Sequence, residues 1–252
     1  TLQWASDDLA SIQVYAVRPK AGSSDVFFKL TGSHIPEMVT DIFSNVYDNE
    51  KWNFAVRFRP EAELFGNLVT TGSTAGKYKL EFYGVTQRFG VVTNEFSLTT
   101  SNLTKTFGES FVNAPKRLYA GAHRTNFTGT VVEQTDVKIS NLKYWLSYID
   151  NETVKDHATN MHGYGPKNPY QNKGFYQSSL SNTEVPYLET LALDWNFNIV
   201  SSSADSSGRF LIEDFSSGSS DLRDRYSWLG QITKQLYSGR ADFLSANETD
   251  VC

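Results

Sequence analysis

The sequence predicts an all-β protein, in which an antiparallel two-sheet sandwich is followed by a smaller, incomplete β region. Three observations support this fold class. Short apolar runs recur at a spacing of roughly ten residues, without helical patterns between them. The segment WNFAVRFRP (52–60) alternates apolar and polar residues with period two, and KYKLEFYG (77–84) repeats the alternation. Aromatic residues make up 14% of the chain, and their rings suit half-buried sheet surfaces.

The first part of the chain reads as strands separated by turns. SIQVYAVRP (11–19) and DVFFKLTG (25–32) are the first two expected strands, and the residues from Gly32 to Pro36 are expected to break the second one. EMVTDIFSNVY (37–47) has mixed periodicity that fits a helix or a strand. We favour a strand, because the tight polar turn YDNEK (47–51) leads directly into the next strand.

The segment 52–60 is the clearest strand in the sequence, and its two faces differ in polarity. We expect its apolar side chains to point inward, and these are Trp52, Phe54, Val56 and Phe58. The side chains expected to point outward are Asn53, Ala55, Arg57 and Arg59. Downstream, VTQRFGVVTNEFSLTTS (85–101) is expected to be a strand pair or a bulged strand that ends in a Ser/Thr-rich loop.

The block from 114 to 160 is the most patterned part of the chain. The brief apolar run RLYAGA (117–122) is followed by RTNFTG (124–129), which predicts a turn. VKISNLKYWLSYI (137–149) predicts a long strand with an irregularity at Ser140 and Asn141. A short helix is expected to follow, with Asn151 as its N-cap and Glu152 in its first turn.

The composition changes after this block. Residues 161–188 are rich in Gly, Pro, Asn and Tyr and predict a linker. ETLALDWNFNIV (189–200) and GRFLIEDFS (208–216) predict a hairpin, whereas residues 226–243 fit either a helix or a strand, and we favour a strand. Too few strands remain for an independent sandwich, so we expect a partner or missing chain to complete this region.

The order of motifs resembles a known family. A strand (118–122), an F-x-G turn at Phe127–Gly129, a strand at 136–139 and the residues Tyr144–Leu146 resemble the closing segment of laminin-G-like domains, which belong to the concanavalin A-like superfamily. The strands 52–58 and 78–84 resemble two earlier strands of that family. The resemblance covers residues 25–160 and implies a jelly-roll sandwich whose rim loops or concave face bind glycans or protein partners, often with one calcium ion.

These features divide the chain into four expected regions. They are an N-terminal strand and linker (1–24), a laminin-G-like sandwich (25–160), the linker (161–188) and the start of a second β domain (189–252). The long Asn/Tyr/Gly-rich linker between consecutive domains is most similar to modules of large viral or phage virion proteins. The resemblance therefore implies a location in a virion or another extracellular assembly.

Charge, cysteine content and hydropathy exclude several classes of protein. The formal net charge is −5 and no block of Lys or Arg stands out, so we expect no nucleic-acid binding. The only cysteine is Cys252, which rules out a disulfide within the chain. No signal peptide is visible, and no apolar run approaches the roughly 18 residues that a membrane span needs. Because the sequence starts at Thr1, we expect a processed product or a fragment.

Candidate catalytic residues do not form a convincing set. A glycoside hydrolase needs two carboxylates that face one cleft. Glu133 and Asp136 are three residues apart and would point to opposite faces of a strand, and the adjacent Glu213 and Asp214 fail in the same way. Zinc is not expected either, because the chain has one cysteine and four scattered histidines. These histidines are His34, His123, His157 and His162.

Three further groups of residues have two interpretations each. Asp48, Asn49 and Glu50 offer oxygen ligands for calcium, but we favour a polar hairpin turn. The Asn-x-Ser/Thr sequons occur about as often as chance allows, so they do not indicate secretion; they start at Asn102, Asn126, Asn151 and Asn247. Aromatic residues in or beside the linker could stack on sugar rings, but we favour packing; they are Tyr164, Tyr170, Phe175, Tyr176 and Tyr187.

The sequence therefore predicts a non-enzymatic structural or adhesion module of a virion or another extracellular assembly. Its expected partners are other protein subunits of the assembly and surface glycans. A calcium-dependent carbohydrate-binding lectin is the alternative, and a glycoside hydrolase ranks third. No cofactor is expected, apart from a structural calcium ion in the lectin interpretation. The sequence assigns no catalytic, ligand-binding or metal-binding residue.

Overall fold

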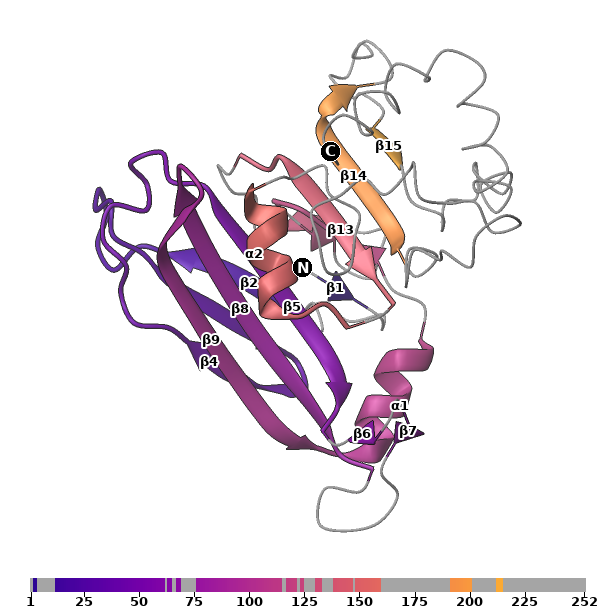
Figure 1. Cartoon of the computed structure of the whole chain (residues 1–252). Helices are drawn as coiled ribbons and strands as arrows, with labels where there is room; N and C mark the ends of the chain where they lie inside the picture. Colours follow the sequence, from indigo (N-terminus) through magenta and orange to yellow (C-terminus); the bar gives the residue numbers. More distant parts are fainter. Residues whose placement is uncertain are drawn as a thin grey trace, which may run out of the picture. The chain divides into compact units, whose positions relative to one another are not determined.

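The fold was obtained as a computed structural model, and its described part is mostly β, with antiparallel pairing in every sheet and two short helices (Figure 1). The chain divides into unit 1 (Thr1–Lys138) and unit 2 (Ile139–Cys252). The structure describes residues 2–3, 12–61, 63–64, 67–68, 76–114, 117–121, 123–124, 130–132, 138–146, 148–159, 191–200 and 212–214.

The first sheet of unit 1 has the order β2-β3-β4, with β2 at Gln13–Val17, β3 at Phe27–Gly32 and β4 at Ile35–Val39. The predicted break from Gly32 to Pro36 is too long, because β4 already begins at Ile35. Pro36 is tolerated because β4 is an edge strand and Pro36 lies at an irregularity of its pairing with β3, where it has no partner in the register. The strand predicted over 37–47 ends at Val39, and residues 44–49 form turns.

The second sheet of unit 1 has the order β5-β8-β9 and contains the longest strands (Figure 1). β5 spans Trp52–Pro60, β8 spans Tyr78–Arg88 and β9 spans Val91–Leu103, so the segment 85–101 forms part of a strand pair. β8 lies in the middle and is buried on both faces, with Leu80 and Val85 fully enclosed on opposite sides. This strand is the centre of unit 1.

Aromatic rings from both sheets of unit 1 pack together in one core. The ring of Phe28 on β3 lies 4.7 Å from the ring of Trp52 and 4.8 Å from the ring of Phe54, both on β5. It also stacks on Phe96 of β9, with 5.5 Å between ring centroids. These rings are large apolar surfaces in close offset or edge-on contact, which is the arrangement that aromatic pairs prefer. These rings join the two sheets together with aliphatic residues of the same core, such as Leu30 and Leu80.

The apolar face of β5 points to the core as predicted, because Trp52 and Phe54 contact Phe28, but the two faces of the strand do not differ in exposure as the alternation suggests. Phe54 and Val56 are 38% and 39% exposed, whereas Arg57 on the other face is only 8% exposed. β5 is an edge strand, so the core covers its apolar face only in part. Arg57 is enclosed because the carboxylate of Glu81 on β8 neutralises it at 3.3 Å.

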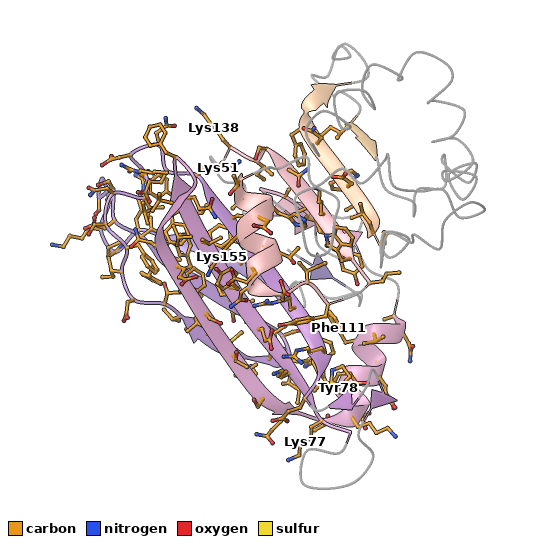
Figure 2. All side chains as sticks on the ribbon, in the orientation of Figure 1. Lys51, Lys77, Tyr78, Phe111, Lys138 and Lys155 are labelled. Atoms are coloured by element: carbon orange, nitrogen blue, oxygen red, sulfur yellow. The ribbon has the colours of Figure 1, made fainter. Side chains whose placement is uncertain are left out.

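The Ser/Thr-rich loop predicted at the end of 85–101 is wrong, because β9 continues to Leu103; helix α1 (Lys105–Asn113) follows in a segment for which the sequence gives no prediction. The hydroxyl of Thr104 caps it by accepting a hydrogen bond from the N–H of Phe107 at 3.3 Å. Phe111 projects from the helix against Phe58 of β5, with 4.5 Å between ring centroids. In Figure 2, Phe111 and Tyr78 are labelled at this end of the sheet, and Lys51 lies towards the opposite end.

Several two-residue strands complete the described part of unit 1. They pair as β1 with β10, β6 with β7, and β11 with β12. The segments are β1 (Leu2–Gln3), β6 (Glu63–Leu64), β7 (Asn67–Leu68), β10 (Arg117–Leu118), β11 (His123–Arg124) and β12 (Val131–Val132).

Unit 2 contains a three-stranded sheet in the order β13-β14-β15. β13 spans Asn141–Trp145, β14 spans Leu191–Val200 and β15 spans Ile212–Asp214. The antiparallel pairing of β14 with β15 confirms the predicted hairpin. The long strand predicted over 137–149 is wrong, because residues 138–140 lie outside any strand and β13 ends at Trp145. β13 pairs with β14, so these two distant segments of the chain form one sheet.

Helix α2 (Asn151–Thr159) confirms the predicted short helix, but its cap is not the predicted residue. The carboxylate of Asp150 accepts the N–H of Thr153 at 2.8 Å, so Asp150 is the capping residue and Asn151 already lies in the helix. Both side chains can cap a helix, and sequence patterns place helix ends only to within one or two residues.

Part of the predicted organisation cannot be compared with the fold. The turn core at 125–129, the linker 161–188 and the segment 226–243 lie outside the described residues. The division at 138 and 139 falls inside the range predicted as one sandwich. The described strands form separate small sheets and do not by themselves close a jelly roll.

Candidate functional site

Three connections gather at one end of unit 1, and we call them together the loop end. They are residues 18–25 between β2 and β3, residues 40–51 between β4 and β5, and residues 88–92 around the β8–β9 turn. The first two are joined directly, because the N–H of Tyr47 donates to the carbonyl of Ser24 at 3.0 Å. The guanidinium of Arg18 also lies 3.5 Å above the centroid of the Tyr47 ring.

The β8–β9 turn carries the most exposed aromatic side chain in the described part of unit 1. Its two central residues are Phe89 and Gly90, which lie between the paired residues Arg88 and Val91. Both have positive φ, 52° and 76°, as in a type I′ turn. Asn, Asp and Gly are the residues usually found there, because a bulky side chain at positive φ is strained. Phe89 nevertheless occupies the first position and is fully exposed.

The turn is held in place by an ion pair at its base. The guanidinium of Arg88 lies 2.9 Å from one carboxylate oxygen of Glu50. The other oxygen accepts the indole N–H of Trp52 at 3.2 Å, and the side chain of Glu50 is buried. The buried carboxylate of Glu50 therefore links the turn to the start of β5, with the Arg88 side chain itself 60% exposed.

Other apolar side chains of the loop end are also exposed. Val91 is 65% exposed beside Phe89, and Ile42 is 58% exposed on the connection 40–51. Tyr47 is exposed as well, although Arg18 covers one face of its ring. Single exposed apolar residues are common, but an aromatic residue on a braced turn with apolar neighbours resembles the anchor of a protein interface.

The charges of the loop end balance. Residues 18–25, 40–51 and 88–92 contain four basic and four acidic side chains, namely Arg18, Lys20, Lys51, Arg88 and Asp25, Asp41, Asp48, Glu50. The first two connections differ in the sign of their exposed charges, because 18–25 begins with two exposed cations and 40–51 carries two exposed aspartates. A surface without net charge exerts little attraction on a polyanion or an anionic membrane.

A second polar cluster lies on the face of the β5-β8-β9 sheet that carries the odd-numbered residues of β8. Three cations surround the carboxylate of Glu81: Arg57 at 3.3 Å, Arg59 at 3.0 Å and Lys79 at 3.2 Å. Burial would raise the pKa of Glu81, but the Lys79 hydrogen bond and the charges of Arg59 and Arg57 together lower it. A carboxylate that stays ionised in this way is a poor general acid, so the cluster is suited to holding strands together.

Unit 2 contains a buried ionisable pair. Lys143 on β13 lies opposite Asp194 on β14, and the Asp194 carboxylate also accepts the side-chain N–H of Asn141 at 3.2 Å. Burial lowers the pKa of Lys143, and the charge of Asp194 opposes that shift. Cross-strand pairs of opposite charge stabilise antiparallel sheets, which accounts for this arrangement.

The residues that the sequence singled out are dispersed in the structure. Asp48 and Asn49 belong to the turn over 44–49, while the carboxylate of Glu50 holds Arg88 and Trp52. Among the described residues, no group of three or more His, Cys, Asp or Glu side chains is placed to hold a metal ion. Among the candidate histidines, His34 packs near Phe107, and His157 of unit 2 stacks on Trp145.

Several candidates have no described side chain. Glu133, Asp136, His162 and the linker aromatics all lie outside the described residues. Glu213 and Asp214 lie at the end of β15, where only the backbone is described. Of the sequons, Asn102 is exposed in β9 and Asn151 lies in α2, whereas Asn126 and Asn247 fall outside the described part.

The sequence interpretation did not single out Phe89. The sequence nevertheless indicates a two-residue hairpin turn here, because Phe-Gly lies between two runs that alternate as strands do. A two-residue connection of type I′ requires positive φ at both positions, and only the second residue is a glycine. An aromatic residue where Asn is expected is a local conflict of the kind that concentrates at functional sites.

No helix among the described residues is both long and apolar enough to cross a membrane. Comparison with known proteins gives no relative: no family model, no curated protein and no solved structure matches the chain.

Proposed function

We propose that unit 1 is a non-enzymatic docking module that contacts protein partners through its loop end. The observation that carries the proposal is the fully exposed Phe89, held at positive φ on the braced turn. A non-glycine residue in this conformation costs on the order of 1 kcal/mol, and such strain concentrates at functional sites. Folding alone would favour Asn at this position.

The surroundings of Phe89 favour a protein partner. Protein interfaces are enriched in aromatic side chains, including Phe, and are surrounded by a polar rim. Phe89 has this setting, because Arg88, Glu50 and Trp52 fix the turn and the rest of the loop end carries balanced charge. Small-molecule sites are concave, whereas this residue projects from a turn.

The finer fold and location belong to the same proposal. We propose that unit 1 is part of a laminin-G-like jelly roll in a virion or another extracellular assembly. The aromatic core shared by the two three-stranded sheets supports the fold. The location is supported only by the resemblance of the sequence to virion modules.

A selection experiment tests the docking function. A phage-displayed library of disulfide-constrained peptides is selected against the full chain, because selected peptides tend to converge on surfaces that are predisposed to bind. We expect most of the selected peptides to bind the Phe89→Asn variant at least about tenfold more weakly than the original chain. The isosteric Val112→Thr change is the matched control, since Val112 is exposed on α1, away from the loop end.

The two outcomes of this selection are distinct. Peptides that lose affinity for Phe89→Asn but not for Val112→Thr support docking at the loop end. Peptides that bind all three proteins equally well place the preferred binding surface elsewhere and contradict the proposal. Circular dichroism of both variants checks that the fold is unchanged.

A further inference from the structure

We infer that the partner of the loop end is a second copy of this chain, an inference that rests on the proposed docking function. The contact would be isologous, with the same surface used on both copies. Two-fold dimers are the commonest soluble oligomers, and they require a surface that is complementary to itself. The loop end meets this requirement in its charge and in its apolar residues.

The charge distribution carries the argument. Arg18 and Lys20 are exposed on the connection 18–25, whereas Asp41 and Asp48 are exposed on the connection 40–51. A two-fold rotation can therefore bring the basic segment of one copy opposite the acidic segment of the other. A surface with a single sign of charge would repel its own copy, but this surface exposes both signs, Arg18 and Lys20 on one connection and Asp41 and Asp48 on the other.

The apolar residues supply the contact itself. Phe89, Val91 and Ile42 are exposed at the same end of unit 1, and each would lose contact with water in such a dimer. The Arg88–Glu50 pair fixes the turn beforehand, so little ordering is needed when the two copies meet. The aromatic ring is the expected centre of the interface, with the charged segments at its edge.

A lipid surface fits these observations less well. Proteins that bind membranes reversibly combine apolar residues with an excess of Lys and Arg that attracts anionic lipids. The loop end has no such excess, and the whole chain has a net charge of −5.

Sedimentation velocity of the full chain tests the inference. We expect a reversible monomer–dimer equilibrium with a dissociation constant of about 1 to 100 µM, measured across that concentration range. Phe89→Asn should raise the dissociation constant at least about tenfold, although Asn suits the turn and should not weaken the fold. The control Val112→Thr should leave the dissociation constant unchanged.

Charge reversal makes the test specific. Lys20→Glu alone places like charges opposite each other in the two-fold contact, so it should weaken dimerisation. The double change Lys20→Glu with Asp48→Lys exchanges the two signs and should restore it, because the complementarity returns. Repetition at high salt should reduce both effects, since these side chains are exposed.

Four outcomes would overturn the inference. The first is a chain that stays monomeric at about 100 µM, and the second is a dimer whose dissociation constant does not change with Phe89→Asn. The third is a double variant that dimerises no better than Lys20→Glu. The fourth is cosedimentation of the chain with phosphatidylcholine vesicles that depends on Phe89. A monomer whose selected peptides still require Phe89 would remove the second copy as partner but leave the docking function in place. A monomer whose peptides ignore Phe89 would remove both.

Discussion

Gly84 shows how one residue can determine the packing of a sheet. It lies on β8 between Phe54 of β5 and Phe96 of β9, which are its partners in the two neighbouring strands. A Cβ atom at this position would lie 2.3 Å from the Phe96 ring and 3.0 Å from the Phe54 ring. Aromatic residues beside a glycine compensate for its missing side chain, so the three positions act as one packing unit.

The first prediction concerns this packing unit. Gly84→Ala should lower the free energy of unfolding of unit 1 by about 1–3 kcal/mol, because the new methyl group collides with a ring that the core holds in place. Urea unfolding monitored by tryptophan fluorescence measures the loss. Adding Phe96→Leu should recover part of it, since the smaller side chain leaves room. Additive losses in the double variant would contradict the collision.

Glu81 illustrates how a buried charge is tolerated. Its carboxylate lies among Arg57, Arg59 and Lys79, and it is itself buried. Each of these cations would be costly to enclose without a counter-charge. The lowered pKa of Glu81 means that the folded state favours the ionised carboxylate more strongly than the unfolded chain does.

The second prediction follows from that pKa. Glu81→Gln should cost about 3 kcal/mol at neutral pH, because it leaves the buried guanidinium of Arg57 without its carboxylate. The ionised carboxylate stabilises the fold fully above its ordinary pKa of 4.5, and this contribution is lost as the pH falls through the lower pKa of the folded state. Unfolding free energies measured from pH 7 to pH 3 should therefore converge for the two proteins in acid. A constant difference across that range would show that ionisation is not the cause.

At the scale of elements, helix α1 depends on a short sequence signal. Thr104 caps the helix, and Phe107 and Phe111 lie one turn apart on the face that packs against Phe58. Gly108 weakens the helical pattern in the sequence, yet a Cβ there would lie 2.1 Å from the Tyr78 ring. The glycine is needed for packing, although it is a poor helix former.

The third prediction concerns the cap. Thr104→Ala should destabilise unit 1 by about 1 kcal/mol, because the N–H of Phe107 loses its acceptor. Thr104→Ser keeps the hydroxyl and should cost much less. Thermal unfolding of both variants measures the difference, and equal losses for Ala and Ser would exclude the hydrogen bond as the cause.

These elements also show what the sequence could predict. The alternation in β5 predicted the strand correctly, because period two reflects the local backbone. It could not predict that Arg57 is buried and Phe54 half-exposed, since coverage depends on which strands lie at the edge of the sheet. Phe89 was not identified for a related reason: its importance depends on its backbone conformation and exposure.

At the scale of the whole molecule, the core of unit 1 lies within a limited part of the chain. Its buried apolar cluster runs from Ile12 to Phe111, and no member belongs to unit 2. Unit 2 has its own sheet, in which β13 pairs with a strand that starts 46 residues after the end of β13. Each unit therefore has an organisation that can respond separately to a mutation.

The fourth prediction concerns the unfolding of the two units. Calorimetry of the full chain should show two unfolding transitions, because each unit has its own sheet and the core cluster of unit 1 includes no residue of unit 2. Gly84→Ala should lower the temperature of one transition and leave the other within about a degree, since the affected rings all belong to unit 1. A single transition that moves as a whole would mean that the units unfold together.

The two-sided burial of β8 has a consequence for the time scale on which unit 1 opens. β8 pairs with β5 on one side and β9 on the other, and Leu80 and Val85 are enclosed on its two faces. Its amide protons should therefore exchange with heavy water only when the unit unfolds globally, whereas those at the Phe89 turn should exchange through local fluctuations. The exchange rate of the slowest β8 amides would therefore report how often unit 1 opens globally.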